Sequence, residues 1–215
     1  MDTFLHAHEA AVRLGFIFGI FAVMAVWEVL APRRALAVSK AVRWVNNIGL
    51  MVFNTVLLRL LFPAAAVGMA AFSASQGWGL LSHFEVDAWL AVPVAVVLMD
   101  SVIWLQHVMV HAVPAFWRLH RVHHADPDYD LTTGARFHPV EIILSMLIKF
   151  ATIMVLGPPV VAVILFEMVL NGMAMFNHAN VRLPATLDRM LRWVVVTPDM
   201  HRVHHSVEDL SLIHI

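Results

Sequence analysis

Residues 100–124 read DSVIWLQHVMVHAVPAFWRLHRVHH, and this stretch decides how the rest of the chain is interpreted. It holds two histidines four residues apart, followed by three more in the pattern HxxHH. The pentapeptide HRVHH occurs again at residues 201–205. Residues at i, i+3 and i+4 share one face of a helix, so each group of histidines would project together. The histidines of these boxes are His107, His111, His120, His123, His124, His201, His204 and His205.

Imidazoles gathered from three short segments indicate a metal site, because neutral imidazole is a common ligand for iron, zinc and copper. A tetrahedral zinc ion takes four ligands. The box histidines therefore fit two metal ions, each with about four or five ligands and an open position. The chain has no cysteine, which excludes thiolate metal sites, disulfides and cysteine nucleophiles.

The boxes HxxxH, HxxHH and HxxHH resemble those of the fatty acid hydroxylase and sterol desaturase superfamily. Two segments carry the resemblance: residues 100–124, including Trp117 and Arg118, and residues 197–206, TPDMHRVHHS. With them, the similarity extends over roughly residues 27–209. It implies an integral-membrane enzyme whose histidines hold two iron ions that activate O₂. Zinc is the expected substitute in a purified sample.

Two histidines outside the boxes, His138 and His178, lie where the resemblance implies a further ligand. The competing interpretation is that these two histidines form hydrogen bonds beside the ligands instead of binding metal. The sequence leaves both interpretations open. Asn177 and Asn180 flank His178 and are predicted to orient it.

The composition predicts an all-α integral membrane protein. The chain has 215 residues, 60% of them hydrophobic and only 13% charged, and its mean hydropathy is +0.78. Soluble domains are about half apolar and about a quarter charged. One domain covering residues 1–215 is expected from this length. A net charge of −1 argues against nucleic-acid binding.

Three transmembrane helices are predicted at residues 11–31, 48–72 and 88–111, since about 20 apolar residues cross a bilayer. Residues 142–176 are apolar but too long for one span, and Gly157, Pro158 and Pro159 interrupt them. A helical hairpin fits, and one long kinked helix is the competitor. The hairpin would place every box histidine on one side of the membrane, together with 11 of the 14 Lys and Arg. That excess predicts a cytoplasmic histidine-rich cap on a multi-pass protein.

Charged residues inside the predicted spans need partners, because an ionisable group is costly there. Lys149 and Glu167 lie at matching depths of the hairpin and are predicted to pair. Arg59 and Asp100 form the second predicted pair. Asp100 has an alternative role as a hydrogen-bond acceptor for a ligand imidazole. Residues 181–206 are expected to lie along the membrane interface, with Arg192 and Trp193 as anchors.

The resemblance implies an O₂-dependent oxidoreductase that hydroxylates or desaturates a lipid, with a fatty acyl, sterol-like or carotenoid chain. No flavin, haem or iron–sulfur motif is visible, so an external electron donor is expected. A ferredoxin, or a b-type cytochrome with its reductase, would serve. The alternatives are a metal-ion permease or sensor, and an inactive family member that acts as a lipid-binding scaffold. Family members continue well past the last box, so we expect the C-terminus to be incomplete.

Overall fold

The computed structural model describes residues 2–206, with side chains from residue 11 onward. Within this range the chain is helical, and its only extended pairing is an isolated bridge between Pro32 and Val181. The prediction of an all-α protein is confirmed. The elements are α1 (Asp2–Leu30), α2 (Lys40–Leu61), α3 (Ala65–Ser75), α4 (Leu80–His83), α5 (Ala88–Ala112), α6 (Pro114–His124), the 3-10 turn η1 (Thr133–Ala135), α7 (Pro139–Leu156), α8 (Val160–Asn177), α9 (Ala185–Leu191) and α10 (Pro198–His204).

Five segments are long and apolar enough to cross a membrane, as expected for three spans and a hairpin. Large apolar side chains such as Phe18, Phe53 and Trp104 are exposed along them, which suits contact with lipid. The spans are Ala11–Leu30, Lys40–His83, Ala88–Ala112, Pro139–Leu156 and Val160–Asn177.

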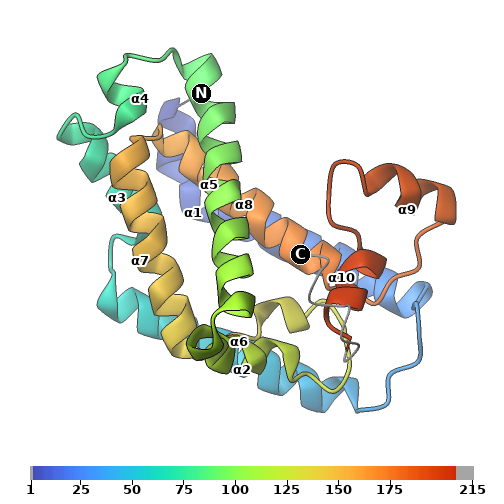
Figure 1. Cartoon of the computed structure of the whole chain (residues 1–215). Helices are drawn as coiled ribbons and strands as arrows, with labels where there is room; N and C mark the ends of the chain where they lie inside the picture. Colours follow the sequence, from blue (N-terminus) through green and yellow to red (C-terminus); the bar gives the residue numbers. More distant parts are fainter. Residues whose placement is uncertain (1, 207–215) are drawn as a thin grey trace.

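The second span differs from its prediction as one helix over residues 48–72. The chain breaks between α2 and α3, where Pro63 has no backbone N–H to donate and Phe62 is not helical, with φ −134° and ψ 72°. In Figure 1, α2 crosses the end of the molecule where α5 meets α6, whereas α3 runs beside α7. The bend therefore brings the polar start of α2 under the histidine-bearing segments.

The predicted hairpin is present as α7 and α8, joined at residues 157–159. Gly157 adopts φ 65°, and a Cβ there would lie 2.4 Å from the Trp78 carbonyl oxygen, so glycine is required. The predicted pair is also confirmed, with Lys149 Nζ 3.2 Å from Glu167 Oε1. Arg13 of α1 reaches the other oxygen of Glu167, a contact that the sequence interpretation missed.

The second predicted pair, between Arg59 and Asp100, does not form. Both side chains are exposed and no ion pair joins them. The reason is the bend after Leu61, because α2 runs across the end of the molecule instead of alongside α5.

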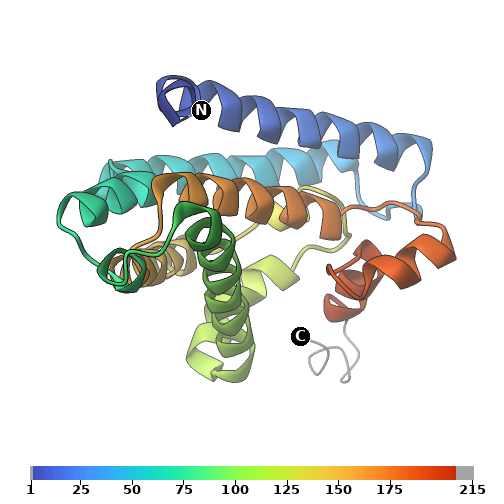
Figure 2. The same ribbon diagram turned by 90° about the horizontal axis from the view of Figure 1, so that it is seen from above.

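Small side chains let the spans approach closely. Ala66, Ala70, Ala95 and Ala162 are completely buried at the contacts of α3, α5 and α8. Close backbone approach through small residues is typical of helix packing in membranes. In Figure 2, α1 and α8 run side by side in the same direction. This packing sets the positions of the C-terminal ends of α5 and α8 relative to each other. Both ends carry histidines.

The expectation of an incomplete C-terminus concerns residues 207–215, which lie outside the described residues.

Candidate metal centre

The first two histidine boxes face each other because the chain turns between α5 and α6. Val113 is extended, with φ −98° and ψ 116°, and Pro114 opens α6 at its first position. Proline suits that position, and it disfavours helix in the residue before it. Rings of α5 and α6 then meet, with the His111 and His120 centroids 4.8 Å apart.

The third box lies on α10. Thr197 caps this helix by accepting a hydrogen bond from the Met200 N–H, and Pro198 occupies its first position. Figure 1 shows α10 beside the end of α8, close to α6. His201 and His204 project from α10, and His205 follows directly at its C-terminal cap.

Nine imidazoles form two adjoining clusters. In each group the ligand nitrogens lie within 4.8 Å of one another. The four-histidine cluster consists of His123, His178, His201 and His205. The five-histidine cluster joins two groups that share His111, and consists of His107, His111, His120, His124 and His204.

Spacings between the nitrogens suit metal coordination. His178 Nε2 lies 3.1 Å from His123 Nε2 and 3.0 Å from His201 Nε2. His107 Nε2 and His204 Nε2 are 3.0 Å apart. Two nitrogens bound at right angles to one ion, each at about 2.1 Å, would be about 3.0 Å apart.

Several buried ring nitrogens have no hydrogen-bond partner among the described residues. These are Nε2 of His120, His124 and His205, and both ring nitrogens of His111. A buried polar atom without a partner is costly, and a metal ion would satisfy such nitrogens. The donor set is imidazole alone, without cysteine, which fits iron or zinc.

Burial keeps the histidines of the four-histidine cluster neutral, as ligands must be. Burial lowers the pKa of His178 to about 4, against a smaller opposing effect of its hydrogen bond to the Ala174 carbonyl, and the neighbouring imidazoles lower the pKa further. Burial, followed by neighbouring histidines, places the pKa of His123 and of His201 well below the usual value. At neutral pH no proton has to leave before a metal binds.

Comparison with known proteins agrees with this geometry. The profile described as fatty acid hydroxylase matches residues 92–211, more than half of the chain. The chain belongs to the fatty acid hydroxylase family. Ornithine lipid hydroxylase OlsE of Rhizobium tropici is 26% identical over 151 residues, which cover 66% of this chain and 45% of that protein. Alkylglycerol monooxygenase of Xenopus tropicalis is 32% identical over 101 residues, which cover 46% of this chain and 21% of that protein.

The chain thus spans less than half the length of these two curated relatives. No solved structure gave a significant match.

Of the two histidines outside the boxes, the structure brings only His178 into a cluster. His138 instead caps α7, where its Nδ1 accepts a hydrogen bond from the Val140 N–H at 3.1 Å. The resemblance could not separate them, because both follow an aromatic residue near a membrane boundary.

The side chains predicted to orient the ligands make no hydrogen bond to an imidazole of the described residues. Asp100 is exposed on α5 and has no hydrogen bond to an imidazole. The Asn180 side chain bonds to the backbone of Arg34, at 2.8 Å through Nδ2 and at 3.2 Å through Oδ1. Asn177 contributes its backbone carbonyl, which accepts from the Tyr129 hydroxyl at 2.6 Å.

Three other groups form hydrogen bonds to rings of the candidate ligands. His120 Nδ1 lies 2.6 Å from Glu141 Oε1, His123 Nδ1 lies 3.2 Å from the Arg136 carbonyl oxygen, and His178 Nδ1 lies 2.7 Å from the Ala174 carbonyl oxygen. Each acceptor favours a proton on Nδ1, which leaves Nε2 free for a metal. Two of the acceptors are backbone atoms, and Glu141 is 21 residues from its histidine, so no sequence spacing indicates them.

We expect Glu141→Ala to weaken metal binding about 10–100-fold, the usual effect of losing such an outer partner. Glu141→Gln keeps an oxygen acceptor and should lose less. Titration against a chelator of known affinity measures both variants, with the exposed Glu85→Ala as control. Equal affinities for the alanine variant and the unmodified protein would contradict the role of Glu141.

The segment after α6, residues 126–133, contains no α-helix, yet most of its polar side chains are buried. Arg43 of α2 binds Asp126 through two hydrogen bonds of 2.8 Å, and its Nη1 binds Asp130. The amide of Asn47 donates to Asp126 at 2.9 Å and to the Thr132 hydroxyl at 3.0 Å. Side chains from the start of α2 therefore hold this loop in place through hydrogen bonds.

Arg136 links this loop to a ligand. It donates to the Val122 carbonyl at 2.8 Å and to Asn47 Oδ1 at 3.0 Å, while its own carbonyl accepts from His123. On the other side, Glu28 of α1 accepts from the backbone N–H of Leu131 at 2.7 Å and of Asn180 at 2.8 Å. The loop thereby positions His123 and the segment after His178.

Gly134 sits against His178, and alanine has no room there. An added Cβ would lie 2.8 Å from the Ala174 carbonyl oxygen and 2.9 Å from His178 Nδ1, the two atoms that hydrogen-bond to each other. We expect Gly134→Ala to destabilise the protein by about 1–3 kcal/mol through overpacking. Metal bound by the four-histidine cluster should fall as well.

Gly49→Ala is the matched control, because a Cβ on this glycine of α2 would meet nothing within 4 Å. Metal analysis and thermal unfolding in detergent compare the two variants. Full metal content in Gly134→Ala would show that His178 tolerates the displacement.

Proposed function

We propose that this protein is a membrane-bound, non-haem diiron oxygenase that hydroxylates a lipid. The observation that carries the proposal is the gathering of nine imidazoles into adjoining clusters of four and five. His123, His178, His201 and His205 would hold one iron ion. His107, His111, His120, His124 and His204 would hold the other.

The reaction class follows from these ligands. When bound, a pair of iron ions supplies the capacity to activate O₂ and remove hydrogen from an unactivated carbon. Overall, a C–H group, O₂, two electrons and two protons give C–OH and water. The protein's own groups hold the rings: the Glu141 carboxylate and the carbonyls of Arg136 and Ala174 fix the ligand tautomers. Burial of His123 and His178 would limit the access of water to the ion that they hold.

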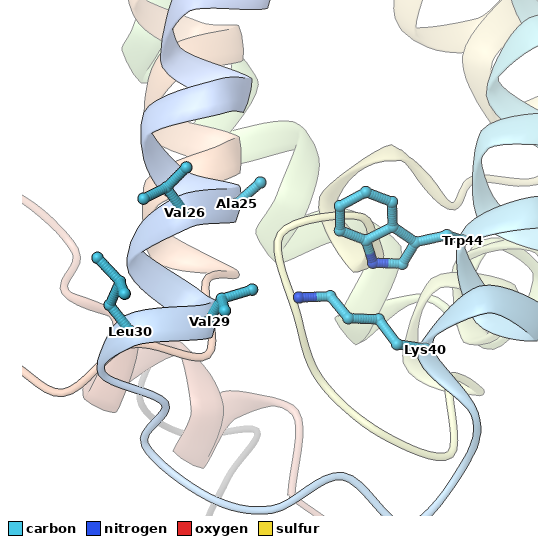
Figure 3. Close-up of a pocket in the computed structure, with 6 residues that line it drawn as sticks. All are labelled: Ala25, Val26, Val29, Leu30, Lys40 and Trp44. Atoms are coloured by element: carbon cyan, nitrogen blue, oxygen red, sulfur yellow. The ribbon is translucent and has the colours of Figure 1, made fainter.

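The substrate we propose is a membrane lipid whose hydrocarbon chain enters from the bilayer. An apolar hollow of about 430 Å³ lies between α1 and α8, lined from Phe16 and Ile20 to Met173 and Phe176. Phe176 is only two residues before His178, so the hollow leads towards the four-histidine cluster. A second apolar hollow, of about 380 Å³, lies between α1 and α2 (Figure 3). There Lys40 lies over the Trp44 ring at 4.9 Å and pairs with Glu28 at 3.0 Å, so its charge is already matched.

Hydroxylation is the favoured outcome over desaturation because both relatives are named for oxygen insertion, one as a hydroxylase and one as a monooxygenase. Both names also specify a lipid: an ornithine lipid and an alkylglycerol. The electrons would come from an external ferredoxin, or from a b-type cytochrome with its reductase. The excess of Lys and Arg near the clusters supports a cytoplasmic site.

Lipid mass spectrometry tests the proposal. Cells expressing the protein should contain a lipid that is 16 mass units heavier and whose formation requires O₂, a shift that corresponds to one added oxygen atom. Cells expressing the His123→Ala, His204→Ala double variant should lack it. A loss of about two mass units would instead indicate desaturation, and identical lipids in the two strains would count against an enzyme.

A further inference from the structure

One face of α6 carries two arginines opposite the metal ligands. We call the stripe of Pro114, Arg118, Arg121 and Ala125 the arginine face. These residues are exposed, whereas His120 and His123 on the other side of the helix are each 1% exposed. A charge on this face therefore lies one helix thickness from both clusters.

The charges of the arginine face are not neutralised. The three carboxylates that follow in the sequence are turned inward: Asp126 and Asp130 bind Arg43, and Asp128 lies 3.8 Å from Arg34. Among the described residues, no carboxylate forms an ion pair with Arg118 or Arg121. A partner that covered this face would need acidic groups of its own.

The arginine face also lacks the side chains that enter lipid. Between Val113 and Val140 no large apolar side chain is exposed. The candidate spans expose many, and the tip after α9 exposes Trp193 by 88%. The contrast favours a water-facing surface for α6, and a soluble protein as its partner.

Trp117 connects this surface to the five-histidine cluster. It neighbours Arg118 and is half-buried. Its ring centroid lies 5.2 Å from that of His111 and 5.4 Å from that of His124. The Trp117 indole therefore lies between the arginine face and the rings of His111 and His124.

We propose that the arginine face docks an acidic, soluble one-electron carrier of the ferredoxin class, and that its electrons enter the five-histidine cluster at Trp117. This inference rests on the proposed function. Each encounter would oxidise one carrier and deliver one electron to iron held by the five-histidine cluster, which would pass from the ferric to the ferrous state. Two encounters supply the two electrons that one hydroxylation consumes.

The test measures how fast an acidic [2Fe–2S] ferredoxin, reduced beforehand, reduces the iron-loaded protein in detergent micelles, by stopped-flow absorbance. Steering between opposite charges raises association rates about 10–1,000-fold and weakens with salt. We expect Arg118→Glu, Arg121→Glu to lower the bimolecular rate at least about 10-fold at low salt and to abolish its salt dependence. Arg182→Glu, Arg189→Glu is the matched control, because both arginines are exposed outside α6.

A small viologen reductant separates the two proposals. It needs no docking surface, and its reduced form is a cation, so it should reduce the Arg118→Glu, Arg121→Glu variant at least as fast as the unmodified protein. A ferredoxin rate unchanged in this variant would overturn the docking inference. If viologen and O₂ give no hydroxylated lipid with the unmodified protein, the proposed function fails instead.

Membrane anchoring is the competing role of the two arginines. It would leave the ferredoxin rate in micelles unchanged and affect only nanodiscs of anionic phospholipid, which would also overturn the inference. Trp117→Leu should slow reduction at saturating ferredoxin but not reduction by viologen, and Trp117→Phe, which keeps a ring, should recover part of the rate. Equal rates for the leucine variant would remove Trp117 from the electron path.

Discussion

Replacing His123 by alanine is expected to abolish lipid hydroxylation and to lower iron binding from about two ions per chain to about one. His123 belongs to the four-histidine cluster and is 1% exposed, so neither water nor another side chain can take its place easily. Three imidazoles remain, and the ring of His178 loses its partner 3.1 Å away. Metal analysis and lipid mass spectrometry on the same preparation measure both effects.

Two further variants make this result specific. His124→Ala, in the five-histidine cluster, should also remove about one ion, and combining it with His123→Ala should remove both. His138→Ala is the control outside the clusters and should keep its metals and activity. Retention of both ions in His123→Ala would contradict the assignment of the four-histidine cluster.

Arg43→Met is expected to cost about 3–5 kcal/mol of stability, because removing one partner of a buried ion pair strands the other. Arg43 is 3% exposed and faces Asp126 and Asp130, whose side chains are 3% and 0% exposed. The loop they hold also positions His123, so metal binding should fall together with stability. Denaturant unfolding in detergent and metal analysis measure the change.

Neutralising the stranded acids provides the internal control. Adding Asp126→Asn and Asp130→Asn to Arg43→Met should recover part of the loss, since no unpaired charge then remains buried. Arg182→Ala removes an exposed arginine and should change stability by less than about 0.5 kcal/mol. A loss below about 1 kcal/mol in Arg43→Met would show that the loop is held by other contacts.

Much of this architecture could be predicted because its determinants are local or repeated. The spacing of His120, His123 and His124 predicts a common helix face, and the second HRVHH repeats it. Residues 157–159 mark the hairpin turn through glycine and two prolines. Matching depth in that hairpin was enough to predict the Lys149–Glu167 pair, which is present.

The rest depends on contacts that no local pattern encodes. Glu141 reaches His120 from another helix, and two ligand acceptors are backbone carbonyls, which every residue carries. The acidic residues of the segment 126–133 resembled those of a solvated loop, yet Arg43, 83 residues from Asp126, buries them. A single proline, Pro63, redirected the second span and thereby removed the predicted Arg59–Asp100 pair.

Both clusters include histidines of α10, the last described helix, or of its C-terminal cap: His201 and His205 serve one and His204 the other. Each bound ion would therefore cross-link residues 201–205, which are synthesised late, to helices that are synthesised earlier. While the ribosome has not yet released residue 204, neither cluster is complete. Iron loading would then report that synthesis has passed this point, and a chain cut short before Thr197 would lose both ions at once.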